Sequence, residues 1–334
     1  GHGSSRGKAQ RTSVKSSTSA KIVVLSGGVG AAKLLNGLQK VVDPTDITAI
    51  VNVADDTQLH GLHISPDLDT ITYTLAGEID PKKGWGLKNE SWNAIEMISR
   101  YGGVDWFQLG DRDLGTHMYR THRILQGHSL TAVTQEIARS LKVGVTILPV
   151  SDNPISTFVS TTTLGEIAFQ EYFVRHHHNL EIKDVSFKGI EEARPGPNVI
   201  DEITSASVII IAPSNPIVSI GPILAVPGIS EALQTKKAST VAVSGIINGK
   251  ALKGPADRML LELGHEVSPT GVARIYQDVA SKFVLDNADD KYKTDIEKLG
   301  FTCLATDTVI PSQEKSEALC STILSTFFPE ALKT

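Results

Sequence analysis

The feature that most constrains the fold is an apolar run that breaks into a glycine-rich turn and then into a sequence with helical spacing. Ile22-Val23-Val24-Leu25 is short and β-branched, which is typical of a buried strand. Ser26-Gly27-Gly28-Val29-Gly30 follows, and apolar residues then recur at helical spacing over 33–38. A second apolar run, 47–53, completes a strand, helix and strand unit with a right-handed crossover. The first two strands are therefore predicted to be parallel.

Later apolar runs extend this sheet. Residues 143–149, 207–212 and 240–244 are each apolar, end in turn residues and have helix-forming sequence between them. We therefore predict an α/β fold, a Rossmann-like doubly wound parallel sheet within a single domain over residues 21–330.

Two segments depart from the sheet pattern. Residues of about 70–140 are richer in Trp, charge and helical spacing, which predicts a largely helical insertion. The stretch 157–190 alternates polar and apolar residues, which predicts an antiparallel hairpin on the edge of the sheet. Residues 1–20 have no apolar periodicity and are interpreted as a disordered tail or an expression remnant.

Composition excludes several classes of partner. The net charge is −5, and because residues 1–20 hold basic but no acidic residues, the rest of the chain is more acidic still. We therefore expect neither nucleic acid nor an anionic membrane as a partner. The sequence has no apolar run of the roughly 18 residues that a membrane span needs. Cysteines are too few for a disulfide framework, and a cytoplasmic location is expected.

The glycine turn is a candidate phosphate site. Gly27, Gly28 and Gly30 would let backbone N–H groups approach phosphate oxygens at the start of a helix. A tight structural turn is the alternative, and the loop lacks the Gly-Lys-Ser/Thr ending of a P-loop. A nicotinamide site also stays open, because an acidic residue after the second strand could bind a ribose.

Four carboxylates follow the second predicted strand. Asp55 and Asp56 stand at its carboxyl end, and Asp67 and Asp69 lie in Ser65-Pro66-Asp67-Leu68-Asp69-Thr70. Such a cluster would repel itself without a cation, and its hard oxygen ligands suit Mg²⁺. Alternatively, Asp67 or Asp69 caps the helix that starts near Thr70.

A second acidic motif, Gly110-Asp111-Arg112-Asp113, follows a predicted short strand or turn over 106–109. Arg112, oriented by the flanking acids, could hold a phosphate or carboxylate, and a purely structural Arg–Asp network is the alternative. The nearby aromatic residues could form a flat surface for an aromatic ligand or belong to the core of the insertion. These residues are Trp85, Trp92, Trp106 and Phe107.

A rigid turn follows the strand predicted at 207–212. Between its prolines and glycine, Ser214, Asn215 and Ser219 are small polar residues that could read a base or a phosphate. The run 176–178 consists of three histidines, but adjacent side chains point in different directions and seldom share one metal ion.

Together these motifs resemble the 2-phospho-L-lactate transferase family of coenzyme F420 biosynthesis, which includes an actinobacterial phosphoenolpyruvate type. The resemblance spans residues of about 21–325, and the motifs occur in the family's order. They are Ser26-Gly27-Gly28-Val29-Gly30, Asn52-Val53-Ala54-Asp55-Asp56, Ser65-Pro66-Asp67-Leu68-Asp69-Thr70, Leu109-Gly110-Asp111-Arg112-Asp113 and the turn from Ala212 to Ile223.

The resemblance implies a phosphotransferase. A GDP-linked phospho-acid would meet the deazaflavin Fo, whose terminal ribityl hydroxyl would attack the acid-bearing phosphorus and release GMP. The donor acid could be phosphoenolpyruvate, 2-phospholactate or 3-phosphoglycerate. A nucleotide-sugar-binding metabolic regulator and a nicotinamide oxidoreductase are the alternatives. A homodimer is the default expectation for such a fold.

The resemblance also implies roles for residues. Asp55 and Asp69 would bind Mg²⁺ or activate the alcohol, with Asp69 also near Fo. Gln108 would contact the deazaflavin at a position where the family sometimes has Lys. Lys33 would neutralise phosphate charge. The guanine nucleotide would be held by the glycine loop and by the turn that contains Ser214 and Asn215.

Overall fold

The computed structural model describes residues 20–332. Its centre is a seven-stranded sheet in which every neighbouring pair is parallel, which confirms the predicted α/β class. In spatial order the strands are β14 (Thr302–Thr306), β13 (Lys282–Asp286), β10 (Thr240–Val243), β9 (Val208–Ile211), β1 (Ile22–Ser26), β2 (Ile47–Val51) and β5 (Thr146–Pro149).

The central strands carry no polar face. Every residue of β1, β2, β9 and β10 is buried, as expected for a sheet covered by helices on both sides. From β1 the chain crosses to β2, whereas from β9 it crosses to β10 on the other side. Because loops diverge where the strand order reverses, a crevice is expected at the carboxyl ends of β1 and β9.

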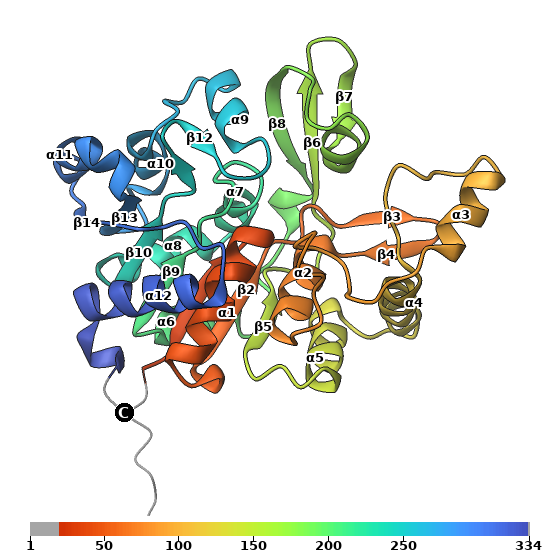
Figure 1. Ribbon diagram of the computed structural model, residues 1–334, viewed down its shortest axis with the longest axis horizontal. Helices are drawn as coiled ribbons and strands as arrows, with labels where there is room; N and C mark the ends of the chain where they lie inside the picture. Colours follow the sequence, from red (N-terminus) through yellow and green to blue (C-terminus); the bar gives the residue numbers. More distant parts are fainter. Residues whose placement is uncertain (1–19, 333–334) are drawn as a thin grey trace, which may run out of the picture.

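Helices cover both faces of the sheet. On one face, α1 (Val29–Val41) packs beside α12 (Gln313–Phe327), and α2 (Pro66–Leu75) packs on α1 (Figure 1). The right-handed crossovers place α6 (Val199–Ser205), α7 (Ile220–Ala225) and α8 (Ile229–Thr235) on the opposite face, where α8 packs on each of the other two. The chain after β10 adds a small hairpin and three more helices, which are β11 (Ile246–Ile247), β12 (Lys250–Ala251), α9 (Ala256–Glu262), α10 (Pro269–Tyr276) and α11 (Lys293–Lys298).

The chain between β2 and β5 forms a separate group of elements beside the sheet (Figure 1). It contains a short hairpin and, after α2, three further helices. These are β3 (Thr57–Leu59), β4 (Leu62–Ile64), α3 (Asn93–Arg100), α4 (Asp111–Leu125) and α5 (Leu130–Ser140). Residues 106–109, predicted to be a strand or turn, belong to no strand.

A three-stranded antiparallel sheet stands apart from the parallel sheet (Figure 1). Its centre is β6 (Ser156–Thr161), with β7 (Gly165–Ala168) and β8 (Ile182–Lys188) on either side. The antiparallel prediction is confirmed, but its location at the edge of the main sheet is wrong. These strands pair with one another and bury their own small apolar cluster around Val159, Phe169 and Tyr172.

Within residues 20–332, no helix has the length and apolar character that crossing a membrane requires.

Candidate active site

The glycine loop and the turn after β9 are packed against each other. The Gly27 amide donates to Ser214 Oγ at 3.1 Å. A Cβ on Gly27 would lie 2.6 Å from Ser219 Cβ, so no larger residue fits there without moving the turn. Gly27 therefore joins the two segments, and its amide points to Ser214.

The next two glycines also make close approaches. A Cβ on Gly28 would lie 2.9 Å from Asp67 Oδ1, and one on Gly30 would lie 2.3 Å from the Pro213 carbonyl oxygen. The loop thus passes between the acidic segment and the turn after β9. Only glycine allows both neighbours to come this near.

These segments meet in a cleft of about 950 Å³ at the carboxyl edge of the sheet. This volume lies at the upper end of the usual range for small-molecule sites, about 300–1,000 Å³. The cleft brings together every site residue predicted from the sequence except Gly27. The predicted residues that line it are Gly28, Gly30, Lys33, Asp55, Asp69, Gln108, Ser214, Asn215 and Ser219.

Asn215 shapes the turn from within. Its Oδ1 accepts from the backbone N–H groups of Ile217 and Val218, at 2.9 and 3.3 Å. These bonds fix the wall of the cleft on which Ser214 and Ser219 stand. Asn215 therefore has a structural role in addition to any contact with a ligand.

Asp55 and Asp67 share one partner, the buried side chain of Asn52. Its Nδ2 donates to Asp55 Oδ2 at 3.2 Å and to Asp67 Oδ2 at 3.1 Å. Burial, followed by repulsion from Asp67 and Asp56, raises the pKa of Asp55 well above its usual range. Burial likewise raises the pKa of Asp67 to about 7. This pair is therefore poorly neutralised by the protein itself.

Asp56 has a different environment although it is the next residue. Its Oδ2 lies 2.9 Å from His63 Nε2 and accepts from Ser65 Oγ at 2.8 Å. Its side chain does not line the cleft. The structure thus separates the two adjacent acids, with Asp55 in the cleft and Asp56 in the support behind it.

Asp69 is held by α4. Its Oδ1 accepts from the Arg120 guanidinium, and its Oδ2 lies 3.6 Å from His117 Nδ1. His117 Nε2 in turn contacts Asp113 Oδ2 at 3.0 Å. Burial raises the pKa of Asp69, although the charges of Arg120 and His117 oppose this shift. Tyr73 closes the chain of contacts by donating to Asp113 Oδ1 at 2.6 Å.

The residues that could hold a divalent cation follow from these partners. Asp55 Oδ1 and Asp69 Oδ2 are both buried and have no hydrogen-bond partner. Asp113 and His117 could also join Asp69, since one ligand atom of each lies within 4.8 Å of the others. Carboxylate oxygens without partners are suitable ligands for Mg²⁺.

The Gly110-Asp111-Arg112-Asp113 motif mainly builds the insertion. Asp111 accepts from the first backbone N–H groups of α3, led by Ala94, and these bonds lower its pKa to about 2. Arg112 donates to the Lys88 carbonyl oxygen and does not line the cleft. The expectation that the flanking acids orient Arg112 is therefore wrong, because Asp111 caps α3 and Asp113 contacts His117 instead.

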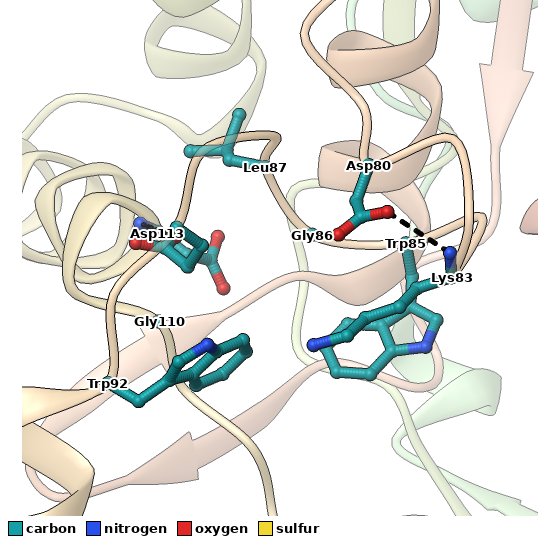
Figure 2. Close-up of a pocket in the computed structure, with 9 residues that line it drawn as sticks. Asp80, Lys83, Trp85, Gly86, Leu87, Trp92, Gly110 and Asp113 are labelled. Atoms are coloured by element: carbon teal, nitrogen blue, oxygen red, sulfur yellow. Dashed lines mark hydrogen bonds between the residues drawn. The ribbon is translucent and has the colours of Figure 1, made fainter.

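Aromatic residues form the insertion's wall of the cleft. Trp85, Trp106 and Phe107 line it, and Trp85 is 39% exposed. Trp92 lies behind, and Lys83 Nζ sits between the two indoles, 4.9 Å from the Trp85 ring centre and 4.1 Å from that of Trp92 (Figure 2). The space there is only about 10 Å³, which is too small for an organic ligand. A flat ligand would therefore find its surface in the main cleft.

The histidine run has no metal cluster among residues 20–332. His177 and His178 line the cleft, whereas His176 faces Glu171 at 4.0 Å. The His178 ring stacks on Phe173, with 5.7 Å between ring centres, and Phe173 stacks on Phe169. This aromatic stack was not foreseen from the sequence.

Several supporting residues were also missed. Asn52 links the two acids, and the Gln170 side chain donates to the Asp55 carbonyl oxygen at 2.9 Å. One signal was available for α4: Asp113, His117 and Arg120 are spaced to share one face of a helix. That spacing could have linked the second acidic motif to Asp69.

Comparisons with known proteins agree on one family. A model of the 2-phospho-L-lactate transferase CofD family matches residues 22–320. A phosphoenolpyruvate transferase from Nocardia farcinica is 45% identical over 83% of this chain and 86% of that protein. A 2-phospho-L-lactate transferase from Methanosarcina acetivorans is 38% identical over 92% of this chain and 99% of that protein.

A solved structure supports the fold. A member of the upf0052 family from Bacillus halodurans superposes with a TM-score of 0.63 and 18% identity. The match covers 91% of this chain and 99% of that one.

Proposed function

Because the chain belongs to the 2-phospho-L-lactate transferase CofD family, and is therefore a transferase, we propose a specific reaction for its cleft. It transfers a phospho-acid from a GDP-linked donor to the terminal ribityl hydroxyl of the deazaflavin Fo, in coenzyme F420 biosynthesis. The observation that carries the proposal is the cleft itself, which joins a glycine loop, buried acids and an aromatic wall.

The reaction balances as a displacement at phosphorus. The Fo hydroxyl oxygen forms a bond to the acid-bearing phosphorus, and the phosphoanhydride bond to GMP breaks. The hydroxyl proton passes to a carboxylate and then to solvent. Because such transfers depend on positioning and charge neutralisation, the protein's task is to hold both substrates in line.

Each wall of the cleft has a share in this task. Gly28, Gly30 and the turn with Ser214 and Asn215 would hold the guanine nucleotide, with Lys33 near its phosphates. Trp85 and Gln108 would contact the deazaflavin from the insertion's side. The substrates would then meet over the buried acids.

Asp55 and Asp69 are proposed as the residues that hold Mg²⁺ and activate the alcohol. Each has one buried carboxylate oxygen without a partner, which is the kind of atom a divalent cation binds. When bound, the cation would supply positive charge to the diphosphate. Asn52 and Arg120 orient the other oxygens of these acids.

The test mixes the protein with Mg²⁺, Fo and synthetic guanosine-diphosphate adducts of phosphoenolpyruvate, 2-phospholactate and 3-phosphoglycerate. Mass spectrometry follows the deazaflavin product and GMP, and the productive adduct identifies the donor. Asp55→Asn and Asp69→Asn should each lower turnover at least about a hundredfold. Asp278→Asn, an exposed acid away from the cleft, is the matched control. Near-normal turnover by both cleft variants would contradict the assigned roles.

Nucleotide binding without any change in Fo would instead favour the regulator. A homodimer and a cytoplasmic location stay predictions, and sedimentation of the purified protein tests the first.

A further inference from the structure

The β11–β12 hairpin leaves the carboxyl edge of the sheet in a fixed direction. Asn248 and Gly249 form its two-residue turn, with φ of 55° and 75°. Such left-handed pairs are favoured in tight hairpins because they match the twist of the strands. The backbone N–H of Asn248 also donates to both oxygens of the buried Asp289 carboxylate, each at 3.2 Å. The hairpin is therefore anchored at its tip.

The segment that follows the hairpin, residues 252–255, reaches both walls of the cleft. Lys253 Nζ lies 3.3 Å from the position that a Cβ on Gly84 would occupy. A Cβ on Gly254 would lie 3.8 Å from Phe173 Cε2. Gly84 belongs to the insertion, and Phe173 lies in the helical turn that connects β7 to β8 of the three-stranded sheet. The segment thus spans the opening between these two walls.

Lys253 also stands beside the glycine loop. The position that a Cβ on Gly84 would occupy, close to Lys253 Nζ, is also 3.7 Å from Val29 Cγ1. Val29 is the first residue of α1. Lys33 lies one turn further along α1, and both lysines line the cleft. Burial, followed by the positive charge of Lys253, lowers the pKa of Lys33.

Neither lysine has an acidic partner within the part of the chain that the structure describes, residues 20–332. No carboxylate lies at ion-pair distance from Lys33 or Lys253. Two ammonium groups from different elements therefore line the same cleft, and neither has an ion-pair partner there. An anion bound between them would relieve their repulsion.

We propose that Lys33 and Lys253 form a clamp for the distal phosphoryl group of a nucleoside diphosphate. The assignment rests on the proposed function for the identity of the nucleotide. Lys253 lies between the glycine loop and the insertion, which is where a phosphoryl group would pass from donor to acceptor. In a nucleoside diphosphate, the phosphoryl group that would lie beside Lys253 is the distal one, because the proximal group stays attached to the nucleoside.

The test is calorimetric titration of the intact protein with GDP, GMP and inorganic pyrophosphate. Lys253→Gln should weaken GDP binding by about tenfold or more, since a charge-assisted contact is lost, and should change GMP binding by less than about twofold. Lys253→Arg should restore most of the GDP affinity. Lys250→Gln, exposed on the same hairpin and outside the cleft, should bind all three ligands as the unmodified protein does.

The outcomes separate this proposal from the proposed function. If Lys253→Gln binds GDP normally, or loses GDP and GMP equally, the clamp is overturned while transfer to Fo can still be observed. If the unmodified protein binds pyrophosphate but not GDP, and Lys253→Gln weakens pyrophosphate binding, the phosphate clamp is supported and the guanosine-linked donor is contradicted. Binding of neither ligand overturns both. Thermal unfolding of each variant identifies any loss that comes from misfolding.

Discussion

Replacing Arg120 by Met should destabilise the fold more than any surface change on α4. The Arg120 side chain is 2% exposed, and its guanidinium pairs with Asp69 and donates to the His63 carbonyl oxygen at 3.1 Å. Methionine keeps much of the apolar stem but leaves Asp69 buried without its cation. Removing one partner of a buried ion pair costs about 3–5 kcal/mol, a large part of a typical total of about 5–15 kcal/mol.

A double-mutant cycle isolates the pair. Urea unfolding in EDTA would be measured for Arg120→Met, Asp69→Asn and the double variant. Each single substitution leaves one buried group without its partner. The double variant should therefore lose less unfolding free energy than the sum of the two single losses, by about 1–3 kcal/mol. Arg123→Met, which breaks a pair with Glu136 near the surface, is the control on the same helix. If Arg120→Met lost no more stability than Arg123→Met, the buried pair would not support the site as argued.

Three further predictions follow from burial and close contact. Asp67 has a folded pKa of about 7 against an unfolded value of about 4, so stability without metal should fall as pH rises through this window. Asp67→Asn should flatten that dependence in thermal unfolding, and an unchanged slope would contradict it. Gly30→Ala should lose about 1–3 kcal/mol in urea unfolding through its clash with Pro213, whereas Gly115→Ala, with open space on α4, should gain about 0.5–1 kcal/mol. Burial raises the pKa of Cys303 to about 11 and that of Cys320 to about 12, so a thiol reagent should label them quickly only after unfolding.

Local patterns predicted the elements that carry the glycine loop. The β-branched run before Gly27 and the helical spacing after Gly30 appear as β1 and α1. The strands β13 and β14 were not foreseen. β14 is Thr302–Thr306 and none of its residues is fully buried, so its sequence lacks the apolar run by which the other strands were found.

The site was harder to foresee because its support comes from contacts between distant segments. Asp55 and Asp69 could be placed near a strand end from their neighbours in sequence. The pairing of Asp69 with Arg120 was not foreseen, because Arg120 reaches Asp69 from another helix and only its spacing from Asp113 and His117 hinted at a shared face. Arg112 shows the opposite error: its acidic neighbours suggested a ligand-binding fork, but Asp111 caps α3 and Asp113 contacts His117.

The tight packing of the glycine loop against the turn after β9 has a consequence for how such a protein can change over time. Gly27, Gly30 and Ser219 leave no free volume between the two segments, so a substitution on one side requires a matching change on the other. In the insertion, the Trp85 side chain is 39% exposed and is less closely confined by its neighbours. Substitutions are therefore expected to be accepted more readily at the Trp85 side chain than at the contact between the glycine loop and the turn after β9.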